Sequence, residues 1–499
     1  MSAATARRST VAIFTLATVL RVGLFPFAEN KHGDAPMRAL IAERFVLDPA
    51  SAHVPRTYCQ FGPLHTTLMR PFIALDRDAA RSSRYLSLLA GLAVFFPFLA
   101  FARRLAGEAR AQTAAFLLAV SPLHLQASTT AASEALYLLL WVSALERLLA
   151  ALETRRLGTF AVAGLLASLA AVTRYDAWLA LPMVAVAAWL FLRRADPARV
   201  TRGLAIFAVT AALFPAAWLV WGAAAGGDPL FFAHYISSDH AGLAATAAAR
   251  FGAFGNRARQ VGIWSLSFLA AMTIPGAVAA VVTLRRGWRA LAPEARLVVV
   301  AALGPPAIYL GQGLIAQSFE PLPRFALIPG TLLLPLAAAA VPPDRVRAFR
   351  VWALATAAAF SVAVWVIATA GRDRIWVGAE SLGALTRLDG EDRAVAAYLR
   401  QIRPPNAPVM IEPSAFADIG IAHAAGIPWT QSVTLIVTRT ARATVRDSLL
   451  STGADLMVGY DRPGGWPSTL PDWPAGGRRF GHWVVVGRDL LRSRGAGGI

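Results

Sequence analysis

The chain has 499 residues, of which 56% are hydrophobic and only 15% are charged, and its mean hydropathy is +0.52. Average soluble domains carry about 25% charged residues, so this composition excludes disordered, collagen-like and coiled-coil proteins and argues against a soluble multidomain enzyme. The single cysteine, Cys59, excludes an intramolecular disulfide and a cysteine-based metal cluster. The formal net charge of +19 is compatible with a nucleic-acid-binding protein. The positions of the arginines along the chain decide whether this interpretation holds.

Apolar segments of membrane-spanning length follow one another between residues 10 and 370. A bilayer core of about 30 Å takes roughly 20 apolar residues per helix, and about eleven windows approach that length. We therefore predict an all-α polytopic membrane protein with about eleven transmembrane helices. Segment 61–75 contains two prolines, a histidine and an arginine, which favour an interfacial or re-entrant piece. The predicted spans are 10–28, 85–101, 112–125, 132–152, 158–172, 177–192, 203–225, 261–283, 297–316, 325–341 and 351–370.

The arginines indicate the orientation of these spans. They are denser in the connections that lie inside when the N-terminus is cytoplasmic. We expect this orientation, with the first span as an uncleaved anchor and an odd number of spans that leaves the C-terminus outside. The excess of arginines is then explained by their role in orienting the spans in the membrane. No contiguous basic face with interleaved aromatic residues is present, so we expect no nucleic-acid partner. The predicted location is the cytoplasmic (inner) membrane.

The C-terminal part of the chain changes character. We predict a membrane domain over 1–371 and a small extracytoplasmic α/β domain over 372–499, which has no apolar run of spanning length. Helix-like and strand-like stretches alternate there, and a Pro/Gly-rich stretch, 461–477, is typical of a loop. The helix-like stretches are 392–402 and 414–426, and the strand-like stretches are 407–413, 454–460 and 482–487.

The predicted outer face has two long loops, 29–84 and 226–260, and holds all eight histidines of the chain. The inner connections are short and leave little room for an active site. Charged residues near a membrane are costly and indicate function by default, although long side chains at helix ends often reach back to water. Chemistry is therefore expected at the outer leaflet or outside it.

Asp34 opens a helix-like stretch in the first outer loop. Pro36 falls in its first turn, and an apolar stripe at helical spacing follows, so the helix is expected to lie along the membrane surface. Spacing alone favours Asp34 as a helix N-cap. The functional interpretation is a general base held at the lipid–water boundary.

Other polar residues lie near predicted outer helix ends, and each has a structural explanation as well as a functional one. His65 belongs to a Gly-Pro-Leu-His turn. Glu134 is a carboxylate at a helix start, where the helix dipole favours it. Arg174 and Asp176 form a short Thr-Arg-Tyr-Asp turn that a salt bridge would stabilise, and Arg324 has the position of a helix-end arginine. Their shared side of the membrane favours a polar outer chamber.

Two tempting metal or phosphate motifs are set aside. Asp76 and Asp78 form a D-x-D in an arginine-flanked connector, where a solvated turn is expected. His234 and His240 lack the i,i+4 spacing of a helical zinc pair. Neither a Walker A sequence nor a Gly-x-Gly-x-x-Gly, Cys-x-x-Cys or Gly-x-Ser-x-Gly motif occurs, so soluble nucleotide chemistry has no support.

In their order, these features resemble the GT-C superfamily of integral-membrane glycosyltransferases over roughly 8–341. The resemblance is to the branch of protein O-mannosyltransferases and lipid A aminoarabinose transferases. Compared with that branch, Asp34 is followed by alanine where a second acidic residue is common, and His65 stands where many members have tyrosine. The segments that carry the resemblance are LRVGLFPF, GDAPMRALIAERF, FGPLHTTLM, SPLHLQASTTAASEALY, AVTRYDAWLALP, GGDPLFFAHY and PRFALIPGTLLLPLAA.

The resemblance implies an enzyme that transfers a hexosyl or pentosyl group from a polyprenyl-phosphate donor to an outer acceptor, with inversion. Asp34 would take the proton from the acceptor hydroxyl. Arg324 and Arg174 would stabilise the departing lipid phosphate. Glu134, Asp176 and His65 would bind sugar hydroxyls or orient the base. The implied partners are this donor, membrane lipid and a glycan, lipid or protein acceptor.

Other functions remain as alternatives. They are another outer-face envelope enzyme, such as a polysaccharide polymerase or ligase, a transporter of lipid-linked sugars, and an inert scaffold of the same fold. No cofactor and no metal is assigned, although a carboxylate close to Asp34 in space would permit a divalent cation. The sugar, the acceptor and the role of the C-terminal domain stay open.

Overall fold

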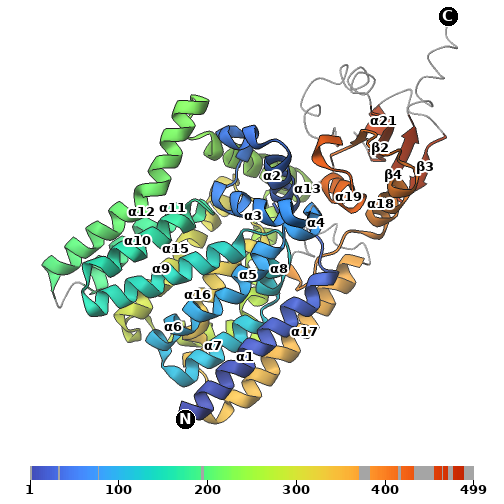
Figure 1. Ribbon diagram of the computed structural model, residues 1–499. Coiled ribbons are helices and arrows are strands. Elements are labelled where there is room, and N and C mark those ends of the chain that lie inside the picture. The colour runs from blue at the N-terminus through green and yellow to red at the C-terminus, as the bar shows by residue number, and fades with distance from the viewer. Residues whose placement is uncertain are drawn as a thin grey trace, which may run out of the picture. The chain divides into compact units, whose positions relative to one another are not determined.

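The computed structural model describes residues 3–31, 34–76, 78–192, 196–369, 382–413, 417–431, 454–462, 465–469 and 476–487. These residues form two compact units (Figure 1). The first unit comprises 1–28, 52–68 and 84–385, and the second comprises 29–51, 69–83 and 386–499. Helix α3 (Pro63–Asp76) begins in the first unit and ends in the second.

The first unit is built from helices. Its long apolar helices pack through small side chains, as α10 and α12 do, because alanine and glycine let helix backbones approach closely. The helices are α1 (Ala3–Leu24), α5 (Tyr85–Ala93), α6 (Phe95–Ala106), α7 (Glu108–Val120), α8 (Pro122–Thr129), α9 (Glu134–Thr154), α10 (Leu157–Ala171), α11 (Asp176–Leu192), α12 (Pro197–Gly226), α13 (Phe231–Met272), α14 (Ile274–Arg285), α15 (Pro293–Gly311), α16 (Leu327–Ala339) and α17 (Val346–Thr369).

Every predicted span falls on one or two of these helices, but the predicted count of about eleven is not confirmed. Among the described residues, six helical stretches are long and apolar enough to cross a membrane, or up to seven when α13 and α14, bent by 105°, count as one. Helices α10, α11 and α16 are apolar but shorter. The six stretches are Arg7–Phe27, Ala79–Ala106, Glu134–Thr154, Pro197–Gly226, Pro293–Ala316 and Pro343–Ile367.

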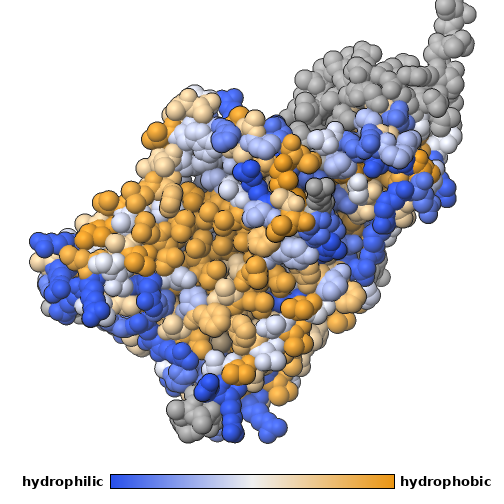
Figure 2. Space-filling view, viewed as in Figure 1, coloured by the Kyte–Doolittle hydropathy of each residue, from blue (hydrophilic) through white to orange (hydrophobic). Residues whose placement is uncertain are grey.

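The exposed surface of this helical unit is apolar over a broad area. In Figure 2 hydrophobic side chains gather over α9 to α12, and hydrophilic ones lie toward the helix ends. Large exposed side chains there include Val162, Trp189 and Phe214. A soluble protein rarely exposes so wide an apolar patch, so the chain is a multi-pass membrane protein.

Segment 226–260, expected as a long loop, is largely helical. Helix α13 begins at Phe231 and continues to Met272, with one break at Gly252, where φ is 69°. Side chains with a Cβ rarely adopt that conformation, so glycine allows the turn at low cost. The helix–helix bend after α13 comes at Thr273, whose hydroxyl accepts the N–H of Gly276 and caps α14.

The second unit contains a small sheet of four strands in the order β1-β2-β4-β3. Strands β1 and β2 are parallel, while β4 pairs antiparallel with β2 and β3. The alternating pattern correctly predicted three strands and missed β3, and the predicted loop also holds a short helix, α21. The elements are β1 (Val409–Ile411), β2 (Leu456–Tyr460), β3 (Arg478–Phe480), β4 (Trp483–Gly487), α2 (Ala35–Leu47), α4 (Ala79–Ser82), α18 (Gly390–Ile402), α19 (Ala417–Ala424) and α21 (Trp466–Thr469).

The core of the sheet unit forms between one face of the sheet and its helices. Val395 and Leu399 of α18 and Ile421 of α19 pack with Val409 and Val458 of the strands. All five side chains are buried. The predicted helix 392–402 corresponds to α18, and the predicted helix 414–426 contains α19, its first three residues lying outside the described part of the chain.

Candidate active site

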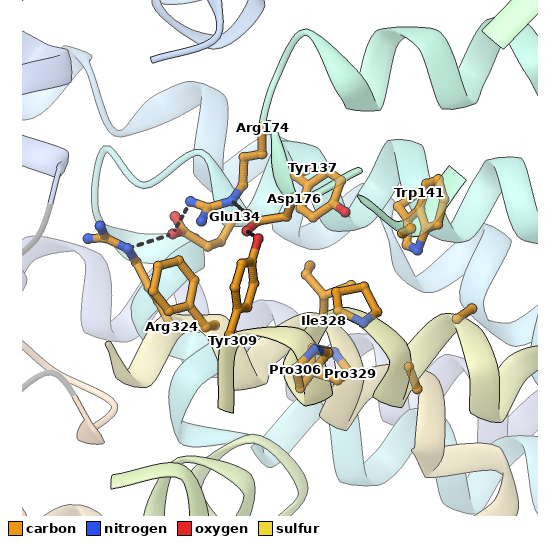
Figure 3. A pocket seen from close by; sticks show the side chains of 15 residues that line it. Glu134, Tyr137, Trp141, Arg174, Asp176, Pro306, Tyr309, Arg324, Ile328 and Pro329 are labelled. Atoms are coloured by element: carbon orange, nitrogen blue, oxygen red, sulfur yellow. Dashed lines mark hydrogen bonds and ion pairs between the residues drawn. The ribbon is translucent and has the colours of Figure 1, made fainter. Parts of the chain in front are cut away.

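A cluster of charged side chains lies in the first unit where α9 and α11 begin (Figure 3). Glu134 is the first residue of α9 and Asp176 the first of α11, and Arg174 lies in the short turn that ends α10. Arg174 donates from Nη1 to Glu134 Oε1 at 2.6 Å and from Nε to Asp176 Oδ2 at 2.7 Å. The predicted intra-turn salt bridge therefore exists, and the same arginine also reaches the neighbouring helix start.

Two further side chains complete this cluster. Arg324, in the 3-10 turn Pro323–Ala326 before α16, lies with Nε 3.4 Å from Glu134 Oε1. The hydroxyl of Tyr309 on α15 donates to Asp176 Oδ1 at 2.7 Å. Four separate segments of the chain thus meet at two carboxylates. Arg174 is the more buried cation, with 8% of its side chain exposed against 20% for Arg324.

The charged cluster forms one end of a pocket whose remaining wall is apolar. In Figure 3 the charged groups and the Tyr309 hydroxyl gather on one side, and proline, isoleucine and tryptophan side chains continue away from them. The pocket is therefore amphipathic, with its charged groups gathered at one end. Its lining residues are Glu134, Tyr137, Trp141, Arg174, Asp176, Ala180, Ala301, Ala302, Pro305, Pro306, Tyr309, Arg324, Phe325, Ile328 and Pro329.

The charges of the cluster balance, but the two cations are held differently. Arg174 has a short contact to each carboxylate, and a buried charge-assisted pair of this kind orients its partners strongly. The contact of Arg324 to Glu134 is longer, at 3.4 Å, and the Arg324 side chain is more exposed. Arg324 is therefore the more accessible of the two cations to an incoming anion, whereas Arg174 is suited to hold the two carboxylates in place.

The predicted Gly-Pro-Leu-His segment packs against the turn that carries Arg174. The backbone N–H of Leu64 donates to the carbonyl of Val172 at 3.2 Å, and the Tyr175 hydroxyl donates to the carbonyl of Phe61 at 3.2 Å. A Cβ at Gly62 would come within 2.3 Å of the Val172 carbonyl oxygen, so only glycine fits here. This segment therefore packs against residues 172–175 and helps to hold the turn that carries Arg174 in place.

His65 itself does not line the pocket. It is fully buried, and its Nε2 lies 3.3 Å from the hydroxyl of Ser87 on α5.

Asp34 belongs to the second unit, where it immediately precedes α2. It occupies the N-cap position, but its side chain does not accept the capping hydrogen bond that spacing suggested. Its Oδ2 instead lies 3.9 Å from Nη2 of Arg38, four residues later. The Asp34 carboxylate therefore does not act as a side-chain cap of α2.

The sequence motifs that were set aside have structural partners. Asp76 forms an ion pair with Arg81 at 2.5 Å, and Asp78 caps α4 by accepting the Arg81 N–H. His234 Nδ1 lies 2.9 Å from Asp228 Oδ2. Within the described ranges, no three histidine, cysteine or acidic residues are grouped as metal ligands.

Two tyrosines of the pocket escaped the sequence-based search. Tyr137 follows Glu134 by three residues on α9, a spacing that places both on one helix face, so its position could have been inferred. Tyr309 lies in an apolar stretch and carries no local signal. It also belongs to an aromatic group, stacking on Phe319 with ring centroids 4.6 Å apart, while Phe325 packs 5.7 Å from Tyr309.

Comparisons with known proteins agree with this architecture. Residues 60–221 match the family described as dolichyl-phosphate-mannose-protein mannosyltransferase, and these residues include Glu134, Arg174 and Asp176. No curated protein matches the sequence significantly.

Solved structures match almost the whole chain. ArnT from Cupriavidus metallidurans in the apo state is 15% identical and aligns over 97% of this chain and 98% of its own, with a TM-score of 0.61. The same protein bound to undecaprenyl phosphate gives a TM-score of 0.64 over 95% and 97%, again at 15% identity. Archaeal oligosaccharyltransferase AglB from Archaeoglobus fulgidus, in complex with an inhibitory peptide and a dolichol-phosphate, is 13% identical over 91% and 69%, with a TM-score of 0.53.

The predicted resemblance to GT-C glycosyltransferases is therefore confirmed. Over residues 60–221 the chain is similar to the dolichyl-phosphate-mannose-protein mannosyltransferases, and along its length it has the fold of the membrane glycosyltransferase ArnT.

Proposed function

We propose that this protein transfers a sugar from a polyprenyl-phosphate donor to an acceptor on the outer face of the cytoplasmic membrane. The amphipathic pocket is the observation that carries the proposal. A polyprenyl-phosphate sugar has a charged, hydroxyl-rich head and an apolar tail, and the pocket has charged groups at one end and an apolar wall beyond them. The related ArnT is known with undecaprenyl phosphate bound, and AglB with a dolichol-phosphate.

The two arginines of the pocket bind the donor phosphate in this proposal. Arg324 contacts it directly, because this guanidinium is the less buried one and has the weaker carboxylate contact. Arg174, the more buried of the two, contributes positive charge near the phosphate and holds Glu134 and Asp176 in place. Those carboxylates accept hydrogen bonds from sugar hydroxyls, and the Tyr309 hydroxyl keeps Asp176 oriented.

Asp34 is the proposed general base, and His65 remains a candidate for sugar binding or orientation. The acceptor hydroxyl oxygen attacks the anomeric carbon and its proton passes to the Asp34 carboxylate. The bond between the anomeric carbon and the phosphate oxygen breaks with inversion. Its electron pair leaves with the lipid phosphate, an anion that guanidinium groups stabilise.

The domain and membrane assignments also remain proposals. We assign residues 1–371 to the membrane domain that binds the donor and 372–499 to an extracytoplasmic domain, with a cytoplasmic N-terminus. The acceptor is a glycan, lipid or protein that is accessible from outside. No cofactor takes part in the proposed reaction.

The test uses the full-length protein in lipid with a panel of radiolabelled polyprenyl-phosphate sugars and crude envelope acceptor. Asp34→Asn is expected to lower the release of polyprenyl phosphate by about 10²- to 10⁴-fold, the usual contribution of a general base. Asp48→Asn, the same change at the other end of α2, is the matched control and should retain activity. Turnover that survives Asp34→Asn would contradict the base, and a protein that binds none of the lipid phosphates would contradict the donor class.

A further inference from the structure

Residues 29–31, just before Asp34, form hydrogen bonds and an ion pair with residues 386–389, which precede α18. The Glu29 N–H donates to the Thr386 carbonyl at 2.9 Å, and the Thr386 hydroxyl donates to the Glu29 carbonyl at 2.8 Å. The Glu29 carboxylate accepts the N–H of Leu388 at 2.6 Å. Lys31, the only lysine of the chain, forms an ion pair with Asp389 at 2.6 Å. We call this set of contacts the 29–389 seam.

The helix after Asp34 is held by the same C-terminal region. Helix α2 contacts α19 and the 3-10 turn Trp429–Gln431. Glu43 of α2 lies with Oε2 3.4 Å from His423 Nε2 on α19, and both side chains are at most one-tenth exposed. Phe45 and Ala39 are fully buried on α2. Most of this short helix is therefore inside the second unit rather than on its surface.

These contacts lie on both sides of Asp34 in the chain. Lys31 precedes it by three residues, and Glu43 follows it within the same helix. A single exposed ion pair contributes little, and Asp389 is 55% exposed. The seam has three hydrogen bonds besides, one of them between two backbones and two between a side chain and a backbone. Bonds to the backbone fix main-chain position better than a flexible lysine does.

We propose that the C-terminal domain positions Asp34: the 29–389 seam and the α2–α19 contact fix the backbone on either side of this carboxylate. The inference rests on the proposed role of Asp34 as base. Glu29, Lys31 and Asp389 are positioning residues in this scheme. A domain that merely covers the outer surface would leave the geometry of Asp34 unchanged when the seam is broken.

The first arm of the test measures the seam without activity. Reductive ¹³C-methylation of the full-length protein labels only the Lys31 ε-amine and the N-terminal amine, and the dimethylated lysine keeps its charge and one N–H. The Lys31 methyl signal should shift in Asp389→Asn and stay in place in Arg479→Met. The latter breaks another partly exposed ion pair of this unit, Arg479–Asp461 at 2.5 Å, which involves none of residues 29–31. An unchanged signal in Asp389→Asn would overturn the seam.

The second arm measures positioning. The double variant Glu29→Ala/Lys31→Met should lower kcat by about tenfold with the donor KM within about twofold, because misplacing a catalytic group weakens the transition state alone. Lys31→Arg should retain at least about half of the activity, and Arg479→Met should match the wild type. Equal losses in Arg479→Met, an unchanged kcat in the double variant, or a loss confined to KM would each overturn positioning.

The two proposals fail in different ways. If Asp34→Asn keeps its turnover, the base assignment fails whatever the Lys31 signal does. If Asp34→Asn is inactive but the double variant turns over normally, Asp34 remains the base and only its positioning by the C-terminal domain is rejected.

Discussion

Buried carboxylates occur in both units, but their partners differ. In the helical unit, the buried Glu134 and the partly buried Asp176 both pair with Arg174, which comes from another segment than Glu134 and from the same turn as Asp176. In the sheet unit, Asp392 accepts the indole N–H of Trp483 at 2.7 Å, and Glu412 accepts the backbone N–H groups of Tyr460 and Trp466, both at 2.8 Å. Neutral donors tie the strands and loops together there, whereas opposed charges line a pocket in the helical unit.

Burial is the main influence on the pKa values of these two sheet-unit acids. Burial raises the pKa of Asp392 to about 6 against the Trp483 hydrogen bond, which lowers it. Burial also raises the pKa of Glu412, despite its two backbone hydrogen bonds. These acids therefore serve the fold at a cost in desolvation. The comparison teaches that burial of an acid does not mark a site by itself, and that the partner set distinguishes the two uses.

The largest effect should come from breaking the charged cluster at its centre. Arg174→Met leaves the buried Glu134 and the partly buried Asp176 without their short contacts to this guanidinium, and removing one partner of a buried pair typically costs about 3–5 kcal/mol. We expect a clear fall in the unfolding temperature of the full chain in lipid nanodiscs. Arg103→Met is the control, because the Arg103–Glu108 pair is 43% exposed on each side and should matter little. Equal unfolding temperatures for Arg174→Met and wild type would remove its structural role.

Arg324→Met should separate binding from stability. Since the Arg324 side chain is more exposed than that of Arg174 and its contact to Glu134 is longer, we expect the unfolding temperature of Arg324→Met to stay close to that of the wild type. If this guanidinium meets the donor phosphate, kcat/KM for the donor should fall by about 10²-fold, as for other single stabilising donors. Arg324→Lys should recover part of the activity, since it restores the charge but not the planar fork. Full activity in Arg324→Met would assign the phosphate to other groups.

The smallest effect concerns Asp392 and depends on pH. Its pKa of about 6 in the fold exceeds the ordinary 3.8, so the folded state binds the extra proton between these values. Stability should therefore be highest below about pH 4, fall as the pH rises to about 6, and stay lower above it. Asp392→Asn keeps an acceptor for Trp483 and removes this loss, which is at most about 3 kcal/mol.

Hydrogen exchange of the β4 amides in the full-length protein measures this effect, after correction for the intrinsic rate at each pH. The wild type should lose protection between pH 4 and pH 7, and Asp392→Asn should not. A pH dependence that is the same in both proteins would contradict this account of Asp392.

Much of the fold could be predicted because hydropathy is a local property. Each apolar window became one or two helices, but the number of membrane spans did not follow, since α10, α11 and α16 are short. Strand β3 was missed because its three residues begin with Arg478 and Arg479 and follow two glycines, which is typical of a loop. Its pairing with β4 is a tertiary property.

The site was predictable only in part. Glu134, Arg174 and Asp176 were found because helix starts and a short turn are visible in the sequence. Tyr309 could not be found, because its hydrogen bond to Asp176 joins segments 133 residues apart and no charged residue lies near it in the sequence. His65 had a suggestive motif, yet its side chain contacts Ser87 and the motif's glycine provides the close approach to the turn.

The break at Gly252 has a mechanical consequence. The part of α13 before it, 231–251, is an arm of roughly 30 Å at 1.5 Å per residue. A change of about 10° at this one residue would move the far end by about 5 Å. That arm carries His240, whose ring stacks on Phe319 with centroids 4.4 Å apart, and Phe319 stacks on Tyr309. A rotation about Gly252 would therefore be transmitted through the stacked rings of His240, Phe319 and Tyr309 to the wall of the pocket.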